Sequence, residues 1–215
     1  MSSSDRGHPV FAALFDRMSR SVEKRGMGRL RRELLSGARG LVVEIGAGTG
    51  LNFAHYPAGV TEVVATEPDP HMLKRAHEAA GRAPVPVRTE QARGEELPLE
   101  DETVDTAVAT LVFCTIPDPD SALAEIHRVL KPDGRLLFLE HVRADDGRLA
   151  RWQDRVQPIW SFFAGGCHPN RDSVAAIERA GFELERVEHF PFSPNVVVDK
   201  PHASGVARKP PQASD

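Results

Sequence analysis

Three glycines in alternation form the part of this sequence best suited to bind a ligand. Gly46, Gly48 and Gly50 follow a short apolar run, where glycines permit a sharp turn and a close approach of a ligand to the backbone. Amides at the start of a following helix would offer hydrogen bonds and a positive dipole end to a carboxylate or another anion. The same pattern also fits a tight strand-to-helix turn that binds nothing.

An acidic residue downstream strengthens the ligand-binding interpretation. Glu67 comes at the end of the next apolar run, where its carboxylate can accept hydrogen bonds from both ribose hydroxyls of an adenosyl ligand. Without the glycines upstream, Glu67 would be interpreted as a solvated carboxylate at the end of a strand. The glycine spacing differs from the G-x-G-x-x-G pattern of dinucleotide sites, so a nicotinamide-dependent oxidoreductase is the weaker alternative.

The histidines and cysteines suggest an acceptor site and no metal site. His141, expected at the end of a strand, is a candidate general base, although a wall or structural histidine is the plainer interpretation. We assign four residues to the substrate pocket: Cys114, Trp152, Trp160 and His168. The histidines lack close ligand spacing and the two cysteines form no C-x-x-C pair, so we predict no metal.

Apolar patterning places these residues on alternating strands and helices. We predict strands at 41–45, 60–66, 85–88, 104–111, 135–141, 182–190 and 202–209, and helices at 8–36, 69–81, 118–130, 152–163 and 170–180. Such alternation indicates a mainly parallel sheet with helices on both faces and ligands beyond the carboxyl ends of its strands. In the first helical region, we expect Arg25, Arg29, Arg31 and Arg32 to face solvent.

Length and charge limit the classes of protein. The 215 residues suit one domain at 39–209, preceded by a helical cap at 8–38 and flanked by disordered ends at 1–7 and 210–215. A net charge of −4 argues against a nucleic-acid partner. No apolar run approaches the roughly 20 residues of a membrane span, and the first residues resemble no signal peptide. We therefore expect a cytoplasmic protein, as a monomer or homodimer.

Several segments resemble the class I S-adenosylmethionine-dependent methyltransferases, especially the ubiquinone and menaquinone C-methyltransferases. These segments are 42–50, 95–99, 105–108 and 130–135. A narrower resemblance, to animal methyltransferase-like enzymes that methylate alkyl thiols, lies in 110–115, 139–142 and the residues around Trp160 and Cys167. The resemblance implies a Rossmann-like fold whose mostly parallel seven-stranded sheet has helices on both faces and an N-terminal helical cap.

The same resemblance implies S-adenosylmethionine as cofactor, with S-adenosylhomocysteine as product. By position, the cofactor-binding residues are Glu44, Gly46, Gly48, Gly50, Glu67, Pro68, Arg93, Gly94, Glu95, Thr110 and Leu111. Many relatives have Asp-Ala where this chain has Arg93-Gly94. Because an arginine cannot accept a hydrogen bond from the adenine amino group, Glu95 or a backbone carbonyl must do so here.

The function that follows is methyl transfer to a small lipophilic acceptor, with an alkyl thiol favoured. Two alternatives stay open within and beyond the family. One is C- or O-methylation of a quinone or phenolic ring, and the other is a protein that binds the cofactor without catalysis.

Overall fold

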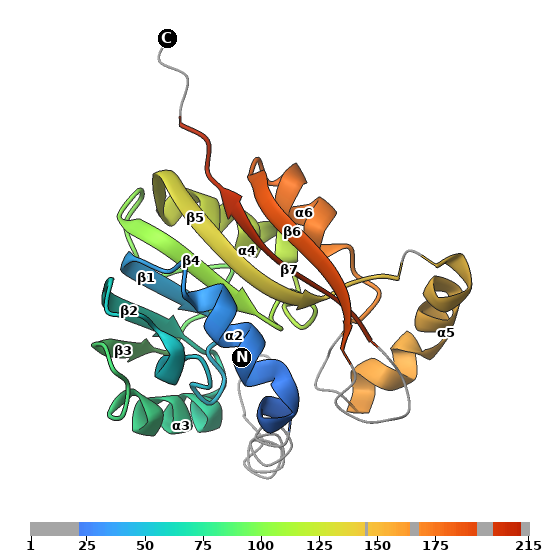
Figure 1. Ribbon diagram of the computed structural model, residues 1–215, viewed down its shortest axis with the longest axis horizontal. Coiled ribbons are helices and arrows are strands. Elements are labelled where there is room, and N and C mark those ends of the chain that lie inside the picture. Colours follow the sequence, from blue (N-terminus) through green and yellow to red (C-terminus); the bar gives the residue numbers. More distant parts are fainter. Residues whose placement is uncertain (1–21, 145, 164–167, 193–199, 212–215) are drawn as a thin grey trace.

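The computed structural model, which describes residues 22–144, 146–163, 168–192 and 200–211, contains one seven-stranded sheet (Figure 1). The strand order is β3-β2-β1-β4-β5-β7-β6. The strands are β1 Gly40–Ile45, β2 Val60–Thr66, β3 Val87–Glu90, β4 Val104–Thr110, β5 Leu130–His141, β6 Glu183–Phe192 and β7 Lys200–Arg208. The first five run parallel, whereas β7 pairs antiparallel with both β5 and β6. The predicted mostly parallel sheet is confirmed.

Helices connect most of these strands. They are η2 Glu23–Met27, α2 Gly28–Leu35, η3 Phe53–His55, α3 Pro70–Ala80, α4 Pro119–Val129, α5 Gly147–Phe163 and α6 Ser173–Arg179. The Asp-Pro pairs begin two of them as predicted, because Asp69 and Asp118 accept hydrogen bonds from backbone amides of the first turn. Asp172 caps α6 in the same way.

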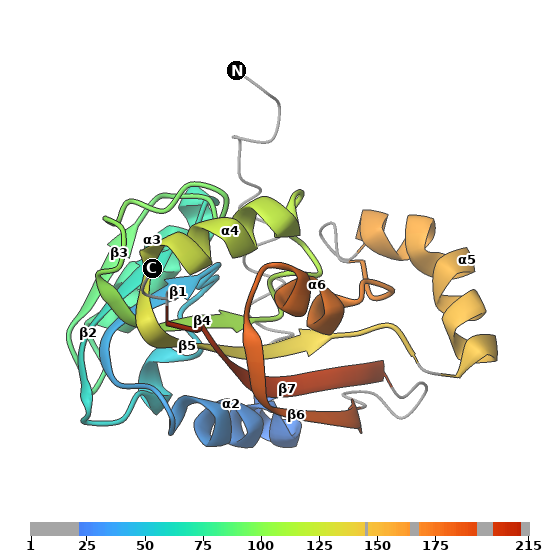
Figure 2. The same cartoon turned by 90° about the horizontal axis from the view of Figure 1, so that it is seen from above.

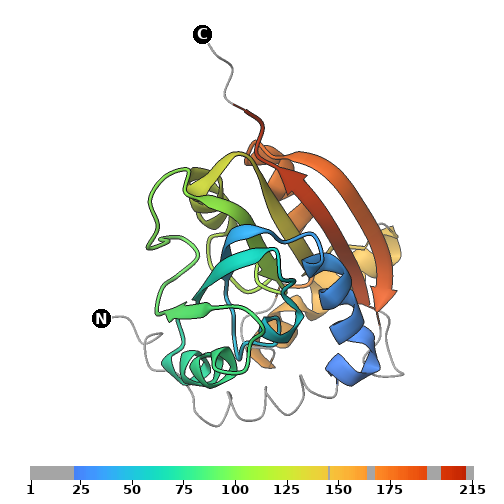
Figure 3. The ribbon, with the colours of Figure 1, turned by 60° about the vertical axis from the view of Figure 1, so that its left-hand side comes forward.

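Two apolar layers hold the helices on the sheet. On one face, β1 contributes Val43 to a cluster with α4 and α6, and on the other it contributes Val42 to a cluster with α2 and α3. Both valines are fully buried, as expected of a strand covered on both sides. Figure 2 shows α4 and α6 on one side of the sheet and α2 on the other, and Figure 3 brings the β3 edge forward.

Several element boundaries differ from the sequence prediction. Strand β3 begins at Val87 instead of residue 85, and α6 begins at Ser173 instead of residue 170. Strand β5 begins at Leu130 instead of residue 135, because Leu130 pairs with Val104 of β4; the register then shifts, and Arg135 pairs with Thr106. Lys209, which is 3% exposed, donates to the Leu130 carbonyl at 2.8 Å.

Helix α5 is set apart from the rest, beyond the end of β5 (Figures 1 and 2). Over the described ranges, no helix is both long enough and apolar enough to cross a bilayer. The helix predicted at 8–36 is confirmed only in part: the described residues from 22 onward are helical, but the helix is kinked at Gly26, whose φ is 127°. Its earlier part lies outside the described residues. The domain limits, the cytoplasmic location and the oligomeric state stay predictions.

Candidate functional site

The glycine loop joins β1 to η3 with a backbone that side chains would disturb. Gly46, Gly48 and Gly50 have φ angles of 62°, 59° and 79°, in the left-handed region. A Cβ on Gly50 would lie 2.7 Å from ring carbons of Phe53, whereas a Cβ on Gly48 would meet nothing within 4 Å. Gly50 is therefore required for packing, and Gly48 leaves its backbone open to an approaching ligand.

Glu67 directly follows β2 and reaches this loop. Its carboxylate accepts hydrogen bonds from the amides of Gly48 and Asp69, both at 2.9 Å, and the residue is 6% exposed. Burial raises the pKa of Glu67, and the two amide hydrogen bonds partly oppose that rise. The two features singled out from the sequence are thus in direct contact.

A second carboxylate, Glu44, lies buried at the base of the loop. The Tyr56 hydroxyl donates to it at 2.6 Å and the Asn52 amide at 3.0 Å. Burial raises the pKa of Glu44 to about 7, against the lowering effects of Tyr56, Arg31 and Asn52. Tyr56 and Asn52 were not predicted as site residues; the signal for them was a carboxylate inside an apolar strand, which must find donors.

Arg31 of α2 completes this buried network, so the prediction that it faces solvent was wrong. One guanidinium nitrogen donates to Asn52 Oδ1 and to Thr110 Oγ1, both at 2.8 Å, while Nε donates to Glu23 at 2.9 Å. Its exposure is 6%, whereas the other three arginines of the group are exposed as predicted. A cation can be buried here because carboxylate and neutral acceptors surround it.

The predicted adenine-side residues lie in loops near the ends of β1 and β2. A Cβ on Gly94 would lie 2.9 Å from Ile45 at the end of β1. The Pro68 carbonyl accepts from the Gln91 side chain at 3.2 Å, and Glu95 accepts from a backbone amide before α4 at 3.4 Å. Arg93 pairs through its backbone with the residue three positions later. Contact of these residues with an adenine ring stays a prediction.

Glu140, which the sequence reasoning did not assign to the site, holds the turn after β4. It is fully buried, and one carboxylate oxygen accepts from the amides of Val112 and Phe113 at 2.8 and 3.1 Å. Leu111, which begins this turn, has a positive φ of 59°. A buried carboxylate thus fixes the backbone that follows Thr110.

Beyond this turn, Cys114 and two histidines come together. The Cys114 thiol lies 3.7 Å from His141 Nδ1, and the His168 amide donates to the Cys114 carbonyl at 2.6 Å. A third histidine, His202 of β7, places its ring 4.5 Å from that of His141. His202 fell within a predicted strand, but nothing in the sequence indicated its partner across the sheet.

The two tryptophans assigned to the substrate pocket differ in what the structure says of them. Trp152, on α5, is 48% exposed and belongs to neither apolar cluster. The Trp160 side chain lies outside the described part of the chain, as does Cys167. The structure therefore brings the Cys114 side chain to His141 and the His168 backbone to Cys114, whereas the tryptophans stay predictions.

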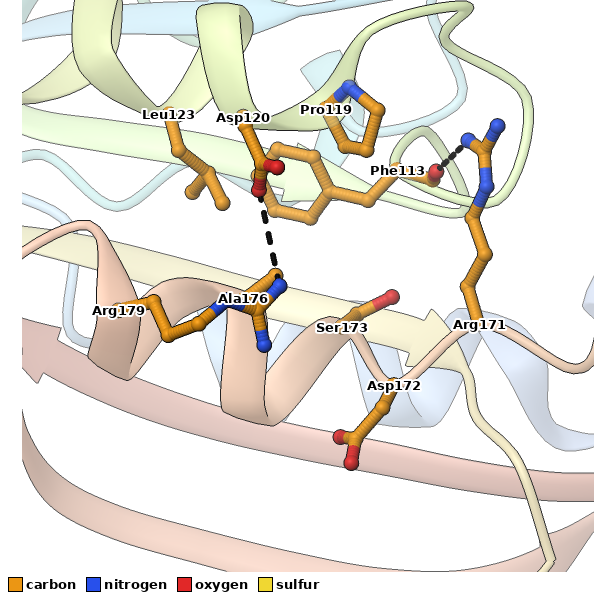
Figure 4. Close-up of a pocket in the computed structure, with 9 residues that line it drawn as sticks. All are labelled: Phe113, Pro119, Asp120, Leu123, Arg171, Asp172, Ser173, Ala176 and Arg179. Carbon is orange, nitrogen blue, oxygen red and sulfur yellow. Dashed lines mark hydrogen bonds and ion pairs between the residues drawn. The ribbon is translucent and has the colours of Figure 1, made fainter.

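A cavity of about 180 Å³ lies elsewhere, between α4 and α6 (Figure 4). Its lining includes Phe113, Leu123, Arg171 and Ser173. The Arg171 guanidinium closes one end by donating to the Phe113 carbonyl at 2.6 Å. This volume is below the roughly 300–1,000 Å³ of small-molecule sites, and the cavity is not formed by the glycine loop. We do not assign it to the cofactor.

The described residues contain no group of three histidine, cysteine or carboxylate side chains placed to hold a metal ion. What the geometry does provide is a turn with open space beside Gly48, a carboxylate that accepts from the Gly48 amide, and an imidazole near the end of β5. Together these groups could bind an adenosyl ligand and accept a proton from a neighbouring acceptor.

Comparisons with known proteins find methyltransferases among the relatives of this chain. Residues 43–138 match a family described as a methyltransferase domain. Thiol S-methyltransferase TMT1B of Rattus norvegicus is 36% identical over 89% of this chain and 82% of its own length. Phosphatidylethanolamine N-methyltransferase of Cereibacter sphaeroides is 31% identical over 90% of this chain and 92% of its own length. A solved SAM-dependent methyltransferase from Thermotoga maritima superposes with a TM-score of 0.68. It is 23% identical in sequence, and the match covers 94% of this chain and 97% of that one.

Proposed function

Because the chain belongs to the class I S-adenosylmethionine-dependent methyltransferases, we propose that it methylates the sulfur of a small lipophilic thiol. The observation that carries the proposal is the match to thiol S-methyltransferases over most of the chain, including the part that holds His141. The imidazole beside Cys114 supports it, because this group could accept the proton that an un-ionised thiol must lose. The family assignment also makes the oxidoreductase alternative unnecessary.

The residues present fit the cofactor at the glycine loop. We assign the methionine end to the turn at Gly48, where the space beside the backbone is open. We assign the ribose to Glu67, whose carboxylate already accepts hydrogen bonds and sits at the strand end. When bound, the cofactor supplies a methyl group on a positively charged sulfur. The protein must therefore align an acceptor with that methyl and exclude water.

A thiol acceptor needs little help to ionise. A thiol with a pKa of about 8.5 costs roughly 2 kcal/mol to ionise at pH 7, and a phenol near 10 costs about 4 kcal/mol. We assign proton removal to His141, since an imidazole nitrogen can accept a proton and this residue lies at the end of β5. Cys114 and His168 would then form part of the pocket wall, together with the two tryptophans of α5.

The direct test is a turnover screen with radiolabelled S-adenosylmethionine. Alkyl thiols, phenols, quinones and phosphatidylethanolamine would be supplied to the purified protein at matched concentrations. We expect the highest kcat/KM with alkyl thiols. Turnover of a phenol or a quinone above that of every thiol would replace this proposal with ring methylation. Cofactor binding without turnover of any acceptor would favour a non-catalytic role.

A further inference from the structure

His202 lies beside His141 in the folded sheet, although the two residues are far apart in the sequence. They are direct partners in the antiparallel β5–β7 ladder, where paired side chains stand on the same face. Their rings are 4.5 Å apart between centroids and inclined by 51°. His202 is 1% exposed and His141 is half-buried, so His202 is the inner member of the pair.

The His202 ring is held from the β6 side as well. Phe190, its direct partner across the β6–β7 ladder, stacks on it at 5.8 Å and 15°, and Phe192 meets it edge-on at 5.6 Å. An imidazole packed between aromatic rings and a neighbouring strand has little rotational freedom. It can therefore restrict the ring that lies against its remaining side, which is His141.

We propose that His202 is a positioning residue, which holds the His141 imidazole in the orientation that removes the proton of the acceptor thiol. This inference rests on the proposed thiol methylation. Cys114 lies 3.7 Å from His141 Nδ1, so we assign proton uptake to Nε2.

The chemical step balances without a further reactant. The S–H bond of the acceptor breaks, its electron pair stays on sulfur, and the proton moves to His141 Nε2. The thiolate sulfur forms a bond to the methyl carbon while the bond from that carbon to the sulfonium breaks, with its electron pair left on the departing sulfur. The products are a methyl thioether, neutral S-adenosylhomocysteine and a protonated His141.

The test compares two acceptors that differ in their need for a base. An alkyl thiol must lose a proton at the enzyme, whereas an aryl thiol with electron-withdrawing groups is already ionised at neutral pH. We expect His202→Phe to lower kcat for the alkyl thiol about 10-fold, which is less than the ~10²–10⁴-fold effect of losing a general base, because His141 itself is still present. We expect kcat for the aryl thiol to stay nearly unchanged. The acidic limb of the pH–rate profile for the alkyl thiol should also move.

Two further variants protect the test from a folding artefact. His202→Asn keeps a polar side chain between Phe190 and His141 and should retain part of the activity that is lost in His202→Phe. His189→Phe makes the same change at an exposed position of β6 and should leave both acceptors unaffected. Calorimetry of S-adenosylmethionine binding shows whether each variant is folded.

The outcomes separate this inference from the proposed function. Suppose that the wild-type protein methylates thiols and that His202→Phe is folded. If kcat then falls equally for both acceptors, or for neither, His202 does not act through proton removal. The same conclusion holds if His202→Phe fails to fold while His202→Asn leaves the pH profile in place. A wild-type protein that binds the cofactor but methylates neither thiol overturns the proposed function, and the inference with it.

Discussion

Glu67 is a residue whose protonation state should control cofactor affinity. An ionised carboxylate accepts from ribose hydroxyls better than a protonated one, and burial raises the pKa of this group above its ordinary value. Affinity for S-adenosylmethionine should therefore fall as the pH decreases from neutrality through that raised pKa. Glu67→Gln should weaken binding by about 2 kcal/mol at pH 7.5 and flatten the pH dependence. Calorimetry across pH measures both, and unchanged affinity would remove Glu67 from the ribose role.

Gly48 and Gly50 offer a matched pair of substitutions within one turn. Both have positive φ, so alanine at either position costs about 1 kcal/mol of backbone strain. At Gly48 the added methyl group enters open space, so we expect a folded protein with at least ten-fold weaker cofactor binding. At Gly50 the methyl group collides with Phe53, so we expect a larger loss of stability. Equal effects of the two variants in thermal unfolding and calorimetry would contradict this division.

At the scale of elements, Arg31 connects α2 to the cofactor loop and to the end of β4. Arg31→Met leaves Asn52, Thr110 and Glu23 without this cation, and we expect the free energy of unfolding to fall by about 3 kcal/mol. Cofactor binding should weaken too, because Asn52 also holds Glu44 beneath the loop. Chemical denaturation and calorimetry check both effects.

Arg29→Met is the control for that experiment. Arg29 belongs to the same helix, and its side chain is 75% exposed in a surface pair with Glu33. Such pairs contribute little to stability, so both measurements should stay close to wild type. If Arg29→Met matched Arg31→Met, the loss would reflect the helix in general and not the buried network.

The elements themselves were largely predictable, because their signals are local. The Asp-Pro helix starts and the apolar runs identified the existence and type of most strands and helices. The predicted boundaries were wrong where tertiary contacts decide them. Strand β5, for example, begins at Leu130 because that residue pairs with Val104 of β4. The glycine loop and Glu67 were recognised from spacing. The burial of Arg31 and the His141–His202 contact were not, since both depend on residues from distant strands and helices.

For the whole molecule, Glu44 should make stability depend on pH. Its pKa in the folded state is about 7, above the ordinary 4.5 of an unfolded chain, so the folded state retains a proton that the unfolded state loses. The stabilising contribution is full below about pH 4.5 and disappears as the pH rises to about 7. Glu44→Gln should remove a decline of up to about 3 kcal/mol over that window, measured by denaturant titration at pH 5 and pH 7.5. A decline of the same size in the variant would assign the effect to other groups.

The position of β7 also has a consequence for synthesis on the ribosome. This strand follows β6 in the chain but lies between β5 and β6, antiparallel to both. The ribosome therefore releases strands β1 to β6 before β7, which pairs with both β5 and β6. Until β7 is released, β6 cannot pair with the sheet. His202 arrives with that final strand, so a nascent polypeptide completes its glycine turn early and its paired imidazoles last.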